Sequence, residues 1–187
     1  MQSRFSLLLL NGTILTVCAV FIGAEQKLLL TSLMLFLPLI DKHNRQLEPI
    51  FYKRQFTAWL ILICLIWILL LLSPSQQQYF LSIVLLTALP EEWFFRRYLQ
   101  NTLKLYFDTK VVFRNISASS LAIICSSLVF ALLHLPLQGY IGLATFIPSL
   151  ILGYSYQMKQ DLIFVILLHS LFNLFFIIYL QNFIQHY

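Results

Sequence analysis

Two long stretches without a charged side chain limit what this sequence can fold into. No Lys, Arg, Asp or Glu occurs from 55 to 90 or from 115 to 158. Each stretch is long enough for two membrane-spanning helices, because one crossing takes about 20 apolar residues. The apolar runs are continuous rather than alternating, which favours helices over the strands of a membrane barrel. We therefore predict an all-α polytopic integral membrane protein, folded as a helical bundle.

The composition agrees with this class. Only 10% of the residues are charged and 60% are hydrophobic, whereas a soluble domain carries about 25% charged residues. The three cysteines, Cys18, Cys64 and Cys125, lie far apart within apolar runs. We interpret them as packing residues, because they lack the spacing of a metal or redox motif.

About seven membrane spans, within a range of six to eight, can be placed along the chain. The second span gives only ~20 Å of helix, less than the ~30 Å hydrocarbon layer, so the sequence leaves open whether it crosses. Without an internal repeat, we expect one membrane-embedded domain over 1–187, with N-terminal spans in 1–75 and a motif-bearing core in 79–180. The predicted spans are 5–24, 28–40, 56–73, 79–100, 116–135, 140–157 and 162–184.

The basic residues gather on one side of this predicted bundle. Most of them fall in the loops 41–55, 101–115 and 158–161, and the positive-inside rule makes these loops cytoplasmic. The net charge of +5 follows from the same rule and from the attraction of anionic lipid. We therefore expect a lipid bilayer around the chain and no nucleic-acid partner.

Two carboxylates and a guanidinium stand at the end of an apolar run. An ionisable side chain in the hydrocarbon layer costs at least a few kcal/mol, which makes it a candidate for function. Glu92 and Arg96 are four residues apart on a helix and can pair. Glu91 is turned about 100° away from Glu92 and stays free to take a proton. The alternative is a cluster at the cytoplasmic interface that reaches toward water.

Pro90 comes directly before these carboxylates. It has no backbone N–H and should kink the helix. We expect a carbonyl near Leu86 to need another hydrogen-bond donor within the membrane.

Two further pairs of polar or aromatic side chains have helical spacing. Phe130 and His134 share one helix face, although a single histidine in a span is more often a packing residue. His169 and Asn173 can both donate hydrogen bonds toward one point, as a developing oxyanion requires. Ser170 lies about 100° from His169 around the helix and in no nucleophile motif, so we do not expect it to be a nucleophile.

Together these residues form three motifs that resemble those of the CPBP family, the CAAX-prenyl-protease and bacteriocin-processing group of intramembrane proteases. The resemblance covers about 79–180 and implies a helical bundle whose motif residues face a wet pocket inside the membrane. It implies an intramembrane endopeptidase that acts on a peptide or protein with a membrane-associated segment, and we expect it in the bacterial inner (plasma) membrane. The motifs are Glu91-Glu92-x-x-x-Arg96, Phe130-x-x-x-His134 and His169-x-x-x-Asn173.

The resemblance also implies a role for each motif residue. A glutamate and a histidine activate water, a histidine and an asparagine stabilise the oxyanion, and an acid–base pair supports the site. We expect no cofactor. A Glu/His/His set can hold zinc, but the asparagine and the carboxylate pair suit a metal-free mechanism. The resemblance assigns the activation of water to Glu91 and His134, the oxyanion to His169 and Asn173, and the support of the site to Glu92 and Arg96.

Two other classes of function remain open at this point. The chain could be a bacteriocin self-immunity protein that binds a peptide without cleaving it. It could also be a proton-coupled transporter, although the sequence has no internal repeat of the kind that many transporters contain. The sequence does not identify the substrate, the side from which it enters or the oligomeric state.

Overall fold

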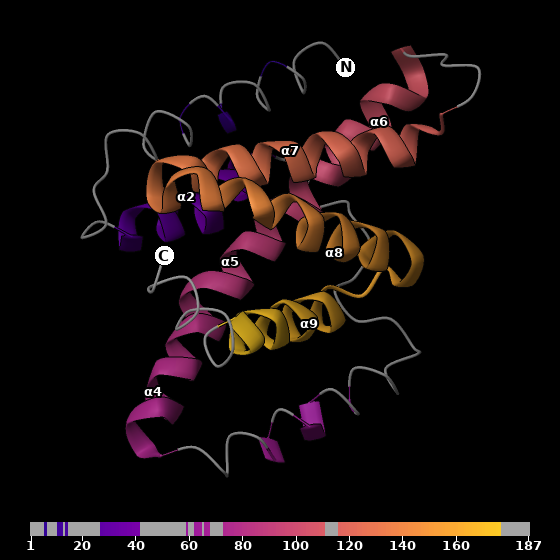
Figure 1. The fold of residues 1–187 in the computed structure, drawn as a ribbon. Helices are drawn as coiled ribbons and strands as arrows, with labels where there is room; N and C mark the ends of the chain where they lie inside the picture. Colours follow the sequence, from indigo (N-terminus) through magenta and orange to yellow (C-terminus); the bar gives the residue numbers. More distant parts are fainter. Residues whose placement is uncertain are drawn as a thin grey trace.

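The computed structural model describes residues 6, 11, 12, 14, 27–41, 59, 62–64, 66, 67, 73–110 and 116–176. Every regular element within these ranges is a helix, so the predicted all-α class is confirmed for the described part of the chain. Figure 1 shows helices α7, α8 and α9 lying roughly side by side, with the path from α4 to α6 running obliquely across them.

The first motif lies on one uninterrupted helical path. It consists of α4 (Pro74–Ile83), η3 (Val84–Ala88), α5 (Leu89–Glu92), η4 (Trp93–Gln100) and α6 (Asn101–Lys110). The segments η3 and η4 are π-helical, and such wider turns inside α-helices often mark functional sites. The short segment that carries both glutamates is therefore flanked on each side by a widened turn.

The prediction for Pro90 is confirmed at the carbonyl of Leu86. The missing N–H is replaced by the hydroxyl of Thr31, which donates to Leu86 O at 2.9 Å. Thr31 belongs to α2 (Lys27–Ile40), so this hydrogen bond joins α2 to the helix of the first motif.

The second motif lies in a helical hairpin. Helix α7 (Ala118–Gln138) begins at Ser117, whose Oγ accepts from the N–H of Ser120, and ends at Gly139 with a φ of +64°. A tight 3₁₀ segment, η5 (Gly139–Thr145), leads into α8 (Phe146–Lys159), which packs back along α7. A Cβ added at Gly142 would lie 2.6 Å from the carbonyl oxygen of His134, so only glycine allows this close approach.

The third motif lies on α9 (Leu162–Phe175). Gln160, in the left-handed region with φ 52°, ends α8, and Asp161 caps α9 by accepting from the N–H of Phe164 at 3.1 Å. Helix α9 contacts α5, η3, η4 and α8, which brings the third motif against the first.

Several predicted boundaries were wrong. The predicted loop 101–115 is helical as far as Lys110, because α6 packs on α7 and buries Leu103. The predicted loop 158–161 is reduced to Gln160 and Asp161. The second span of the hairpin begins at 146 rather than 140, since η5 intervenes. Most of the predicted spans 5–24 and 56–73, and the end of 162–184, lie outside the described residues.

The described surface suits a protein that lies in a membrane. By length and composition, the continuous helical stretch Ala118–Lys159 is long and apolar enough to cross a membrane, and Leu29–Ile40 and Leu162–Phe175 are shorter apolar helices. Large apolar side chains such as Phe36, Ile147 and Met158 are about two-thirds exposed, which suits contact with lipid. The number of crossings stays a prediction.

Candidate active site

Glu92 and Arg96 form the ion pair that their spacing predicts. The guanidinium Nε donates to Glu92 Oε2 at 2.9 Å, and both side chains are completely buried. A buried charge is tolerated only when it is paired and hydrogen-bonded. The far end of the guanidinium also donates, from Nη2 to Ser149 Oγ at 2.7 Å.

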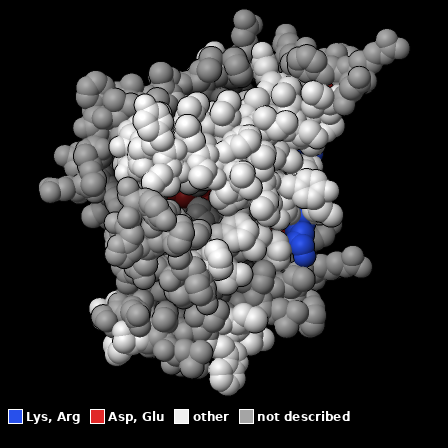
Figure 2. All heavy atoms as spheres, viewed as in Figure 1, with Lys and Arg blue, Asp and Glu red and all other residues white. Residues whose placement is uncertain are grey.

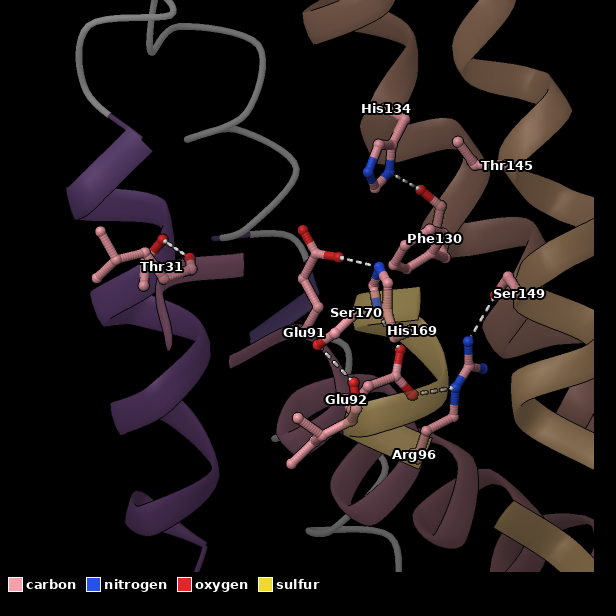
Figure 3. A network of polar contacts seen from close by, with 12 residues as sticks. Thr31, Glu91, Glu92, Arg96, Phe130, His134, Thr145, Ser149, His169 and Ser170 are labelled. Carbon is pink, nitrogen blue, oxygen red and sulfur yellow. Dashed lines mark hydrogen bonds and ion pairs between the residues drawn. The ribbon is translucent and has the colours of Figure 1, made fainter. Parts of the chain in front are cut away.

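His169 lies between the two glutamates (Figure 3). Its Nδ1 is 2.8 Å from Glu92 Oε1, and its Nε2 is 3.7 Å from Glu91 Oε2. Because an ionised carboxylate can only accept, Nδ1–H donates to Glu92. Glu92 therefore uses both oxygens, one for Arg96 and one for His169, and fixes the orientation of the imidazole ring.

Glu91 differs from its neighbour. Its side chain is 13% exposed, and its Oε2 has no hydrogen-bond partner among the described residues. It interacts electrostatically with His134 as well as with His169. A buried carboxylate oxygen without a donor is costly for folding, and it leaves an acceptor ready for a ligand or a water molecule.

One ring nitrogen of His134 is already engaged in a hydrogen bond to its own helix. Its Nδ1 is 2.8 Å from the carbonyl oxygen of Phe130 on the same helix. A carbonyl cannot donate, so Nδ1 carries the proton and Nε2 is the acceptor of the neutral ring. The ring rests on that of Phe130, with centroids 4.3 Å apart and planes tilted by 32°.

The buried ring of Phe130 also contacts the other imidazole. Its centroid is 6.2 Å from that of His169, in an edge-to-face arrangement. Phe95 packs against it from η4 at 4.9 Å. Phe130 is thus a rigid spacer that holds the second and third motifs at a set separation.

A cavity of about 140 Å³ opens beside these groups, between α7, η5, α8 and α9. His134, His169 and Asn173 line it together with Ser149 and apolar side chains that include Leu152. The structure therefore brings both imidazoles and the asparagine to one hollow, next to the glutamates. Figure 2 shows a depression with acidic atoms at its base, on a face where few other described residues are charged.

The described residues contain no group of three or more His, Cys, Asp or Glu side chains that could hold a metal ion. Glu91, His134 and His169, considered above as a zinc set, thus do not form a ready set of ligands in this geometry.

Ser149 was not among the predicted site residues, and the prediction that Ser170 is not a nucleophile stays a prediction. Ser149 lies 53 positions from Arg96, and its only signal was a hydroxyl within an apolar span. The Ser170 hydroxyl is buried and donates to the carbonyl of Ile166 at 2.8 Å, which ties it to its own helix.

The structure brings residues of all three motifs close together. A comparison with protein-family models identifies the family to which the chain belongs. The chain matches the model of the type II CAAX prenyl endopeptidase Rce1-like family over residues 65–175, more than half of its length. The chain belongs to this family. Neither a curated protein nor a solved structure matches it.

Membership of the Rce1-like family sets the general activity. It assigns the chain to the CAAX-type intramembrane endopeptidases, with a peptide or protein as the substrate and an integral membrane location. The matched range contains Glu91, His134 and Asn173, so all three motifs lie within the region that carries the family likeness.

Proposed function

We propose that this chain hydrolyses a peptide bond with a water molecule activated by Glu91 and His134. The observation that carries the proposal is Glu91 Oε2, which is buried, has no hydrogen-bond partner among the described residues and lies 3.7 Å from His169 Nε2. A carboxylate with an unused acceptor, close to a cavity that His134, His169 and Asn173 line, is what a general base requires.

Hydrolysis would proceed without a covalent intermediate. Glu91 accepts a proton from water, with the neutral Nε2 of His134 accepting the hydrogen bond of the other O–H. The water oxygen attacks the carbonyl carbon of the substrate. The C–N bond then breaks as Glu91 returns the proton to the leaving nitrogen.

His169 and Asn173 would stabilise the tetrahedral oxyanion. The Asn173 amide can donate directly from the cavity wall. His169 already donates from Nδ1 to Glu92, so it can donate to the oxyanion from Nε2 only as an imidazolium. Glu92 and Arg96 would support this step by holding the ring in place, and no metal or other cofactor takes part.

The substrate would be a peptide or protein with a membrane-associated segment, and the cavity would hold the scissile bond. We place the chain in the bacterial inner (plasma) membrane, with 41–55, 101–115 and 158–161 on the cytoplasmic side. The excess of basic residues in these segments supports this orientation.

The test is cleavage by the purified protein in lipid nanodiscs. Candidate substrates are farnesylated C-terminal CAAX peptides, their unmodified forms and membrane-anchored leader peptides, followed by mass spectrometry. Glu91→Gln keeps the size of the side chain and should lower cleavage at least about a hundredfold, since general base catalysis supplies 10²–10⁴-fold. Full cleavage by Glu91→Gln would overturn the role of Glu91. Binding of a peptide by both proteins without cleavage would favour the non-catalytic immunity function.

A further inference from the structure

Ser149 on α8 belongs to none of the three motifs but touches their charged network. Its side chain is completely buried, and its hydroxyl oxygen accepts the 2.7 Å hydrogen bond from Arg96 Nη2. A serine in an apolar helix often serves only to allow close packing. Here the hydroxyl is also the acceptor for one end of a buried cation, and this second contact carries the argument.

Two hydrogen bonds hold the Arg96 guanidinium. Nε donates to Glu92 and Nη2 donates to Ser149, while Nη1 has no partner among the described residues. A planar group that is anchored at two atoms cannot rotate, whereas one anchored at a single atom can swing about that contact. Ser149 therefore determines the plane of the guanidinium.

An unused hydrogen-bond acceptor among the described residues, Gln100 Oε1, lies close to the guanidinium. A Cβ added at Gly153, one turn after Ser149, would lie 3.3 Å from Arg96 Nη1 and 3.0 Å from Gln100 Oε1. Gln100 Oε1 is buried and has no hydrogen-bond partner among the described residues. Without the Ser149 hydroxyl, this unused acceptor would draw the guanidinium toward Gln100.

A rotation of the Arg96 guanidinium would also move the His169 ring, because Glu92 is hydrogen-bonded to both. The carboxylate is rigid and planar, and its two oxygens bind Arg96 Nε and His169 Nδ1 at 2.9 and 2.8 Å. If Oε2 follows the guanidinium, Oε1 must move as well. Hydrogen bonds in such a buried network act on one another, so the last contact, from His169 to Glu91, changes too.

We propose that Ser149 is a positioning residue that sets the orientation of the His169 ring through Arg96 and Glu92. Its effect on the ring is independent of the reaction. Its effect on catalysis rests on the proposed function. The two effects are therefore measured separately.

The first measurement is an NMR spectrum of the full chain in nanodiscs with ¹⁵N-labelled histidine. The chain has only four histidines, and His169→Gln identifies the signal of His169. In Ser149→Ala we expect the Nδ1 proton of His169 to move upfield and to exchange with water about tenfold faster, as for the loss of one hydrogen bond to a charged group. Ser149→Thr keeps the hydroxyl and should restore the signal.

Ser127→Ala is the matched control. Ser127 is equally buried, and its hydroxyl has no hydrogen-bond partner among the described residues, so its removal should leave the His169 signal unchanged. An unchanged signal in Ser149→Ala, or an equal change in Ser127→Ala, overturns the proposal. If Ser149→Ala does not fold, Ser149→Cys replaces it, because sulfur is a weak acceptor. An unchanged His169 signal there overturns the proposal as well.

The second measurement is kinetic and uses any peptide that the wild-type chain cleaves. Ser149→Ala should lower kcat about tenfold with KM within about twofold, since the side chain acts on the reacting groups and not on binding. A shifted His169 signal with an unchanged kcat overturns the catalytic part. If no peptide is cleaved by wild type, the proposed function fails, and the NMR result still decides the role of Ser149.

Discussion

At the scale of single residues, the adjacent carboxylates Glu91 and Glu92 have opposite environments. Both carboxylate oxygens of Glu92 accept hydrogen bonds, one from Arg96 and one from His169. Glu91 keeps Oε2 without a hydrogen-bond partner in the described part of the chain. The helical geometry explains the difference, because neighbours in a helix point about 100° apart and only one of them can face Arg96.

Glu92→Gln should destabilise the protein far more than Glu91→Gln. The first change leaves the buried guanidinium of Arg96 without its counter-charge, and breaking a buried ion pair costs about 3–5 kcal/mol. Glu91→Gln removes no hydrogen bond at Oε2, because that atom has no donor among the described residues. Thermal unfolding in detergent, followed by intrinsic fluorescence, measures both. Equal losses of melting temperature would contradict the division of tasks.

The sequence predicted the local pairs but not the contacts between helices. Spacings of four residues were enough to predict the pairing of Glu92 with Arg96 and the shared faces of His134 and His169 with their neighbours. Ser149 was not predictable, because its contact with Arg96 depends on how α8 packs against η4. The roles of the site residues in catalysis stay predictions.

At the scale of helices, the first motif lies on a path whose register changes twice. The two π-helical segments on either side of α5 could not be predicted, because they depend on tertiary packing and on donors from other helices. Pro90 gave a partial signal, and it correctly predicted the carbonyl of Leu86 that Thr31 now satisfies. Helix α6 was missed because its residues are polar on average, although Leu103 is buried.

Thr31→Val should cost about 1 kcal/mol of stability, because it leaves the carbonyl of Leu86 without its hydroxyl donor. Pro90→Ala restores a backbone N–H for that carbonyl. In a double-mutant cycle, Thr31→Val should therefore cost much less in the Pro90→Ala background. Thermal unfolding of the four proteins measures the coupling. Additive effects would show that Thr31 does not replace the missing donor.

Gly142→Ala should displace the end of α7 that carries His134. The new Cβ would lie 2.6 Å from a backbone oxygen, a distance that only a shift of η5 or α7 can relieve. We expect cleavage to fall at least about tenfold, since a displacement of about 1 Å can cost 10²-fold.

Gly139→Ala is the comparison for this substitution. Gly139 has a φ of +64° and a ψ of −156°, a backbone conformation that essentially only glycine adopts, but its Cβ would meet nothing within 4 Å, so alanine there costs about 1–3 kcal/mol of backbone strain without a clash. If both variants lose stability but only Gly142→Ala loses activity, the close approach to His134 is the cause. Equal activity losses would assign the effect to the hairpin as a whole.

At the scale of the whole molecule, the described residues combine a buried polar centre with exposed apolar side chains. The ionised groups Glu92 and Arg96 are fully buried, whereas Leu132, Ile151 and Phe175 are exposed. This is the inverse of a soluble protein and suits a bundle whose solvent is lipid. The Rce1-like family and the apolar stretch Ala118–Lys159 support the same conclusion.

The predicted topology places the two ends of the hairpin on one side of the membrane and its turn on the other. Single cysteines in a cysteine-free background should report this arrangement. Asp108→Cys and Lys159→Cys, both at exposed polar positions, should react with a membrane-impermeant maleimide from the cytoplasmic side, and Tyr140→Cys, at an 88% exposed position, from the outer side. Labelling of all three from one side would show that the hairpin does not cross.

The hydrogen bond between His134 Nδ1 and the Phe130 carbonyl limits how His134 can transfer protons. A histidine that relays protons through a membrane must receive one at one ring nitrogen and release one from the other. Here Nδ1 is already bonded to its own helix, so a proton that arrives at Nε2 can leave only by the same atom. His134 can therefore accept and release a proton at Nε2 within one turnover, but it is poorly suited to relay protons across the bilayer.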